Sequence, residues 1–157
     1  MWIMTLNEIL LKQSVLAPLL VKSGDDELSK ELKVKIVRLR IAFNKIKNQF
    51  EDEIKEFSSS LIPEDLKKLQ EIPEDKRTLE DSKKIEELVN KVNSEYREFL
   101  EQKGKEEVTF TADDSFTDNE FDEIISVNAG NDVTVNGNNV KAEELMDSFY
   151  ALFVDKK

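Results

Sequence analysis

The side chains of this chain that could do chemistry are carboxylates, lysines, hydroxyls and two tyrosines, because histidine and cysteine are absent. The commonest general base, the thiol nucleophile and the usual zinc ligands are therefore missing. The remaining side chains show no spacing typical of a catalytic triad, a phosphate-binding loop or a dinucleotide fingerprint. A glycosidase-like pair of carboxylates stays open on sequence alone. We therefore expect that the chain is not an enzyme, has no catalytic residue and binds no cofactor.

A group of carboxylates in the C-terminal third suggests a cation site, because calcium binds several oxygens from one loop. The group comprises Asp113, Asp114, Asp118, Glu120, Asp122 and Glu123. Its spacing fits no EF-hand loop, and the central glycine is missing. We interpret residues 113–123 as a solvated acidic loop without a metal, and a bound cation is the alternative.

Charge is unevenly distributed along the chain. Residues 106–157 hold 13 acidic and 3 basic residues, whereas residues 1–105 hold 21 and 20, so the net charge of -11 belongs to the C-terminal third. Between Lys30 and Lys47, seven basic residues accompany a single acid. Lys33, Arg40 and Lys47 recur every seven residues on one helix face. That face is predicted to bind carboxylates, either of a neighbouring protein or subunit or of the helix over about residues 79–103 in the same chain (Glu80, Glu87, Glu95 and Glu98).

Nucleic acid offers two alternative interpretations of these charges. The basic stretch could bind phosphates, and the acidic segment could imitate them. Stacking aromatics are not interleaved with the basic residues, since Phe43 and Phe50 fall on an apolar seam, and the overall acidity opposes nucleic acid at long range. Mimics usually spread carboxylates over the whole surface, whereas residues 1–105 are nearly neutral. A nucleic-acid role is therefore disfavoured.

A long helix must position the basic residues, because apolar residues recur at alternating spacings of four and three. The seam consists of Leu32, Ile36, Leu39, Phe43, Ile46, Phe50, Ile54 and Phe57. It predicts a helix over about residues 26–58 that packs against another helix. A helix over about residues 79–103, capped by Thr78 and Asp81, supplies the partner. Phe43, Ile46 and Phe50 are expected to be buried against Leu88, Val92 and Phe99.

Shorter elements complete the prediction. A capping box from Thr5 to Glu8 starts a first helix, which is interrupted near Pro18. Pro63 opens a short helix that ends before Pro73. After Gly104 the apolar period changes to two. This change predicts strands at 108–111, 124–127 and 133–135, a turn at Asn136-Gly137 and a last helix over about 140–153.

The predicted fold class is mainly α, an antiparallel helical hairpin with an N-terminal helix and a small C-terminal α+β lobe. The predicted domains are residues 1–105, a helical hairpin domain, and residues 106–157, a small acidic lobe packed on it. The N-terminal apolar stretch carries charges and a proline, so we expect neither a signal peptide nor a membrane span. The N-terminal segment has more apolar side chains than a helix that covers the hairpin needs, namely those of Trp2, Ile3 and Met4. We expect them to contact another chain.

Several segments resemble a family of small helical proteins of tailed bacteriophages and prophages, encoded among virion and lysis genes. The similarity lies in Thr5–Leu10, in the leucine-rich turn at 16–20 and in Lys33–Leu39, and continues at 99–110 and 141–145. The elbow at 63–78 and the acidic loop at 113–123 are longer than the family pattern. The resemblance implies a virion component or an assembly factor and carries over no catalytic residue.

These observations predict a non-enzymatic structural or accessory component of a tailed-phage virion, assembled in the host cytoplasm. It would bind other virion proteins, in several copies within a symmetric assembly, and would have no membrane partner. The alternative is a soluble phage-encoded acidic inhibitor or assembly helper that is not part of the particle.

Overall fold

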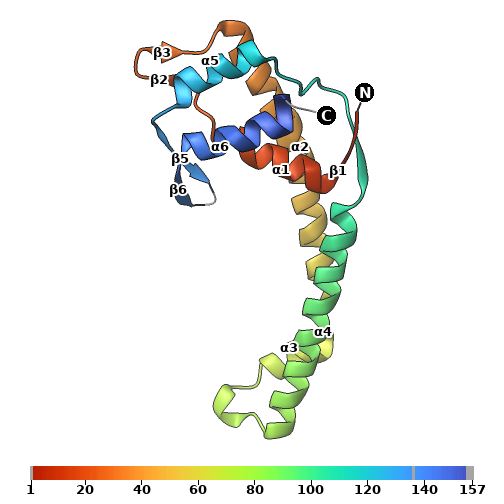
Figure 1. Ribbon diagram of the computed structural model, residues 1–157. Coiled ribbons are helices and arrows are strands. Elements are labelled where there is room, and N and C mark those ends of the chain that lie inside the picture. Colours follow the sequence, from red (N-terminus) through yellow and green to blue (C-terminus); the bar gives the residue numbers. More distant parts are fainter. Residues whose placement is uncertain (1, 136, 155–157) are drawn as a thin grey trace. The chain divides into compact units, whose positions relative to one another are not determined.

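The computed structural model describes residues 2–135 and 137–154, and this part of the chain is mainly helical, as predicted, with small antiparallel sheets (Figure 1). Two compact units form. Unit 1 comprises residues 1–47 and 107–157, and unit 2 comprises residues 48–106. These units divide the chain elsewhere than at the predicted boundary between residues 105 and 106. The reason is that the N-terminal and C-terminal segments pack together in unit 1.

Unit 1 combines short strands with helices. Its elements are β1 (Trp2–Thr5), α1 (Leu6–Leu16), β2 (Lys22–Ser23), β3 (Asp26–Glu27), the first half of α2 (Lys30–Leu61), β4 (Glu107–Phe110), α5 (Asp118–Asn128), β5 (Asp132–Val135), β6 (Asn138–Lys141), α6 (Ala142–Phe149) and a π-helical turn, η2 (Tyr150–Val154). Three antiparallel pairs form in the described part: β1 with β4, β2 with β3, and β5 with β6.

Side-chain caps start two of the helices of unit 1. The Thr5 hydroxyl accepts the Glu8 N–H at 3.2 Å, which confirms the predicted start of α1. Thr117 and Glu120 form a full capping box at the start of α5. The prediction of a strand at 124–127 is therefore wrong, and the acidic loop extends only to Thr117. The cap satisfies the first N–H groups of the helix, so the segment continues as a helix. Ile124 and Val127, three residues apart, then lie on its buried side.

Two further helix starts differ from the prediction. α2 begins at Lys30 rather than near residue 26, because the β2–β3 hairpin occupies the preceding residues and Gly24 turns it with a positive φ of 60°. Ser29 then accepts the Leu32 N–H at 3.4 Å. α6 begins at Ala142, because residues 138–141 pair with β5. Residue 136, in the predicted turn, lies outside the described residues.

An aromatic cluster forms the core of unit 1. Phe43 is fully buried, stacks on Phe110 at a centroid distance of 4.7 Å and meets the edge of Phe153 at 6.3 Å. Phe116 and Phe149 continue the cluster. The prediction that Phe43 packs against the helix over 79–103 is therefore wrong. The seam of α2 is continuous, but β4 and η2 cover it in unit 1.

Two polar groups hold the core of unit 1 together. Asn128 is 0% exposed; its Oδ1 accepts the Leu20 N–H at 2.8 Å, and its Nδ2 donates to the carbonyls of Leu20 and Ile124 at 3.0 and 2.9 Å. Lys12, which is partly exposed, forms an ion pair at 2.6 Å with the buried Asp114. Both arrangements join residues about one hundred positions apart, so they fix the two chain segments of unit 1 to each other.

Unit 2 consists of the second half of α2, α3 (Glu64–Gln70), a 3₁₀ turn, η1 (Glu74–Lys76), and α4 (Leu79–Gly104). The predicted capping box of Thr78 and Asp81 starts α4 and is confirmed. Phe57 stacks on Phe99 at 4.0 Å, and Lys103 pairs with Glu53. In these two contacts, the earlier residue of α2 meets the later residue of α4. Leu66, which is 3% exposed, is buried; the other large apolar side chains of unit 2, all of them in the described part, keep more of their surface in solvent.

Candidate partner-binding surfaces

The predicted N-terminal contact residues lie on β1. Met4 is only 7% exposed and belongs to the core of unit 1, so its side chain is already used within the chain. Ile3 is 68% exposed. The side chain of Trp2 lies outside the described residues. Of the two described side chains, Ile3 is therefore the one that is open to another chain.

Two of the three predicted basic residues have partners within unit 1. Lys33 pairs with Glu27, and the ammonium group, through its hydrogen bond and its charge, lowers the pKa of the Glu27 carboxyl. Arg40 donates to the carbonyls of Leu16, at 3.3 and 3.1 Å, and of Leu19. The Arg40 guanidinium thus binds the last carbonyl of α1, which also accepts the Leu19 N–H at 3.4 Å, and one carbonyl beyond the helix. Burial lowers the pKa of Arg40, and the group stays charged.

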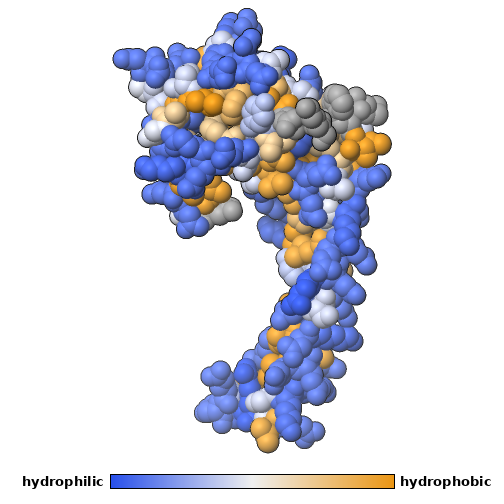
Figure 2. Space-filling view, viewed as in Figure 1, coloured by the Kyte–Doolittle hydropathy of each residue, from blue (hydrophilic) through white to orange (hydrophobic). Residues whose placement is uncertain are grey.

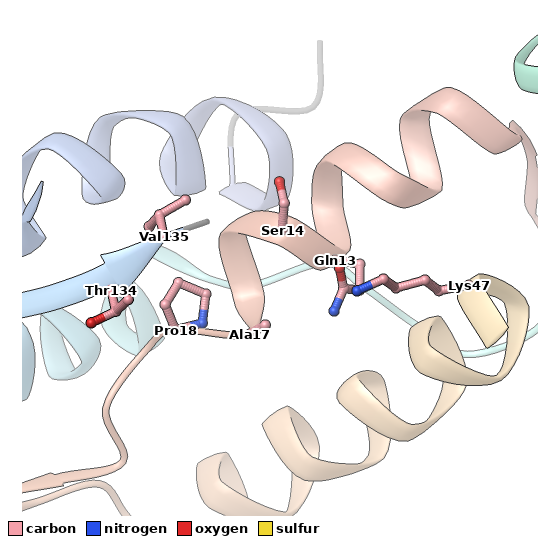
Figure 3. Close-up of a pocket in the computed structure, with 7 residues that line it drawn as sticks. All are labelled: Gln13, Ser14, Ala17, Pro18, Lys47, Thr134 and Val135. Carbon is pink, nitrogen blue, oxygen red and sulfur yellow. The ribbon is translucent and has the colours of Figure 1, made fainter. Parts of the chain in front are cut away.

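Arg40 was predicted to bind a carboxylate, and in unit 1 its guanidinium binds backbone carbonyls. The heptad spacing did place Lys33, Arg40 and Lys47 on one side of α2: Arg40 and Lys47 lie beside α1, whereas Lys33, whose side chain is 32% exposed, pairs with β3. Lys47 lines a hollow of about 230 Å³ between α1, α2 and β5, and its side chain extends toward Gln13 in Figure 3. Gln13 itself donates to the Asn44 side chain at 3.0 Å.

The acidic segment is also largely engaged within unit 1. Asp114 pairs with Lys12, and Asp113 accepts the Ser115 N–H at 2.9 Å. Glu120 forms an ion pair with Lys35 at 3.1 Å. The Lys35 ammonium also lies 4.3 Å from the centroid of the Phe116 ring. Among the described residues, no group of three or more carboxylates could hold a metal ion.

A second apolar stripe runs along α2, on the side away from the core, and the sequence analysis missed it. It consists of Val34, Val37 and Ile41, with exposures of 40, 48 and 64%. We name these three residues the outer stripe. At 3.6 residues per turn, the outer stripe lies roughly 160° around the helix from the buried seam. Its spacing of three and four residues was present in the sequence, between the basic residues, and could have revealed it.

Three exposed cations border the outer stripe. Lys30, Arg38 and Lys45 are exposed, and within the part of the chain that the structure describes they form no ion pair. On one side, Val34 and Arg38 line an open hollow of about 490 Å³ together with Asp113. The surface therefore has an apolar centre and a rim of mixed charge, in which Lys30, Arg38 and Lys45 outnumber the carboxylates of Glu31 and Asp113.

Unit 2 carries a second apolar surface, and carboxylates rather than cations border it. The stacked rings of Phe57 and Phe99 line an open hollow of about 380 Å³ with Glu53, Glu56 and Ser60, which we name the aromatic hollow. Orange patches interrupt the blue surface of this unit in Figure 2. Residues 48–106 hold 17 acidic and 11 basic residues. The Lys103 ammonium donates hydrogen bonds to the carboxylates of Glu53 and Glu106, and these bonds raise the pKa of Lys103.

Comparison with protein-family models, with curated proteins and with solved structures gives no match. Among the described residues, none of the helices combines the length and the apolar character needed to cross a membrane.

Proposed function

We propose that this protein acts by binding other proteins, as a non-enzymatic structural or accessory component of a tailed-phage virion. The observation that carries the proposal is the outer stripe. Single exposed apolar side chains are ordinary on protein surfaces. Three on one helix face, opposite the core and bordered by cations, form the kind of patch against which another helix packs.

The phage context comes from the resemblance of the N-terminal, junction and C-terminal segments to proteins encoded among virion and lysis genes. In this proposal, α2 and α4 form an antiparallel helical hairpin, α1 is the N-terminal helix, and the segment after residue 106 is a small α+β lobe. The partners are other virion proteins, and the chain is present in several copies in a symmetric assembly that forms in the host cytoplasm.

Mass spectrometry of purified particles tests the proposal. We expect the wild-type chain at a fixed, integral ratio to the major virion proteins. Val37→Glu with Ile41→Glu should remove the chain from the particles without changing its circular dichroism, because both positions are exposed. Leu11→Glu is the matched control, since Leu11 is also an exposed apolar residue (53%) but lies on α1.

A photoreactive amino acid at position 37 identifies what the outer stripe touches. Cross-links to virion proteins are expected in assembled particles. If the wild-type chain is abundant in the infected cell but absent from the particles, the virion role is refuted. The acidic helper or inhibitor that acts outside the particle then becomes the better explanation.

A further inference from the structure

We propose that copies of this chain bind one another head to tail, with the outer stripe of one copy on the aromatic hollow of the next. The inference rests on the proposed function, because it names a partner for the same surface. In this arrangement, contacts between copies of the chain contribute to the symmetric assembly.

The two surfaces match in their apolar chemistry. The outer stripe offers three β-branched side chains on a rigid helix, so little side-chain entropy is lost on binding. The aromatic hollow offers two stacked phenyl rings that are only half-buried, although each belongs to a well-packed pair. Each surface exposes apolar area that the other would remove from water.

The two surfaces also match in charge. Lys30, Arg38 and Lys45 border the outer stripe and outnumber the two carboxylates beside it, Glu31 and Asp113. Glu56 borders the aromatic hollow, next to Glu53, whose carboxylate already pairs with Lys103. Packing one outer stripe on another would bring cations together, and packing one aromatic hollow on another would bring carboxylates together. Because like charges across an interface are unfavourable, both self-paired arrangements are disfavoured. The opposite pairing brings cations to carboxylates.

A contact between two different surfaces is heterologous. Each bound pair of copies keeps one unused outer stripe and one unused aromatic hollow, so further copies can add until a ring closes or a filament grows. Closure into a ring is the outcome that fits a component of a symmetric particle.

Sedimentation velocity of the purified full-length chain over a concentration series provides the test. The wild type should form species larger than one chain, in amounts that increase with concentration. Val37→Glu with Ile41→Glu, which disables the outer stripe, should give a monomer. Glu56→Lys with Ser60→Lys should also give a monomer, because these exposed positions reverse the charge and fill the mouth of the aromatic hollow while both rings stay in place.

Mixing the two variants is the decisive step. Each retains the surface that the other lacks, so an equimolar mixture should form a species of two chains and nothing larger. Leu11→Glu should associate as the wild type does. Circular dichroism checks that every variant is folded, and Glu56→Lys alone, with one exposed substitution, is the milder form if the double change disturbs unit 2. Association should weaken several-fold as salt rises from about 0.05 to about 1 M, because salt screens the exposed rims.

Three results would overturn the inference. The first is a wild type that stays monomeric at every concentration, and the second is a Glu56→Lys, Ser60→Lys variant that associates as the wild type does. The third is a mixture that remains monomeric although both variants are folded. The proposed function is judged separately: if the chain is monomeric but the outer-stripe variant is lost from particles, the outer stripe binds a different virion protein.

Discussion

Replacement of Asn128 should weaken the packing between the two chain segments that form unit 1. The Asn128 amide makes three hydrogen bonds, two with the backbone of Leu20 and one with the carbonyl of Ile124. Each is worth about 0.5–1.5 kcal/mol net, and a buried group left without its partner costs more than an exposed one. Asn128→Ala leaves the Leu20 N–H and carbonyl without these bonds. We expect the free energy of unfolding to fall by about 2–4 kcal/mol.

Asn128→Asp has the same shape and tests the chemistry of the interaction. At pH 7 a carboxylate oxygen would replace Nδ2 and face two carbonyls, so we expect a loss at least as large as that of the alanine variant. Burial and these carbonyls would raise the pKa of this carboxyl above its unfolded value of about 3.9. Stability is then least impaired below the unfolded pKa and decreases as the pH rises toward the folded pKa.

Urea unfolding followed by circular dichroism measures the total change, and hydrogen exchange at the Leu20 amide reports on the site itself. Asn139→Ala is the control, because that exposed side chain makes one cross-strand bond, with Thr134. It should change stability by no more than about 0.5 kcal/mol. A loss below about 1 kcal/mol for Asn128→Ala, or a pH-independent loss for Asn128→Asp between about pH 4 and 7, would refute the reasoning.

Three further predictions concern unit 1. Phe43→Ala should cost about 3–5 kcal/mol, and a double-mutant cycle with Phe110 should show about 0.5–1.5 kcal/mol of coupling; zero coupling would mean that the stacked pair does not form. Arg40→Ala should cost about 1–3 kcal/mol in urea unfolding because the carbonyls of Leu16 and Leu19 lose a charged donor, whereas Lys45→Ala should change stability by less than about 0.5 kcal/mol; equal effects would contradict the assignment. The hydrogen bond from the Gly130 N–H lowers the pKa of Glu143. This bond therefore stabilises the fold above the ordinary glutamate pKa, and the stabilisation is lost as the pH falls through the lower folded pKa. Glu143→Gln should therefore flatten the acid limb of the stability curve, and an unchanged limb would argue against this bond.

Local rules predicted the helix ends well where a single side chain decides them. Thr5 and Thr78 start their helices as the capping pattern requires. The same pattern is present at Thr117 and Glu120, although the β-branched run at 124–127 predicts a strand there. The cap decided the outcome, because β propensity depends on pairing with a neighbouring strand, and among the described residues no strand pairs with this segment.

Long-range partners were the part that the sequence could not supply. Periodicity shows that Phe43 lies on a buried face, but the same face could be covered by a helix or by a strand, and here Phe110 of β4 stacks on it. Likewise, a seven-residue repeat shows that Lys33 and Arg40 share a side of α2 without showing what lies opposite. The carbonyls of Leu16 and Leu19 lie 24 and 21 positions before Arg40 in the chain, and no local sequence pattern predicts these contacts.

The pairing of β1 with β4 also constrains the order in which the protein can fold during synthesis. Unit 2 is one uninterrupted stretch, so all its contacts become available once residue 106 has left the ribosome. Unit 1 must wait, since its N-terminal residues have partners such as Asp114, 102 positions after Lys12. Until then, the core faces of α1 and of the first half of α2 have no cover. The nascent chain therefore carries exposed apolar surface for most of its translation, which is when a chaperone would bind it.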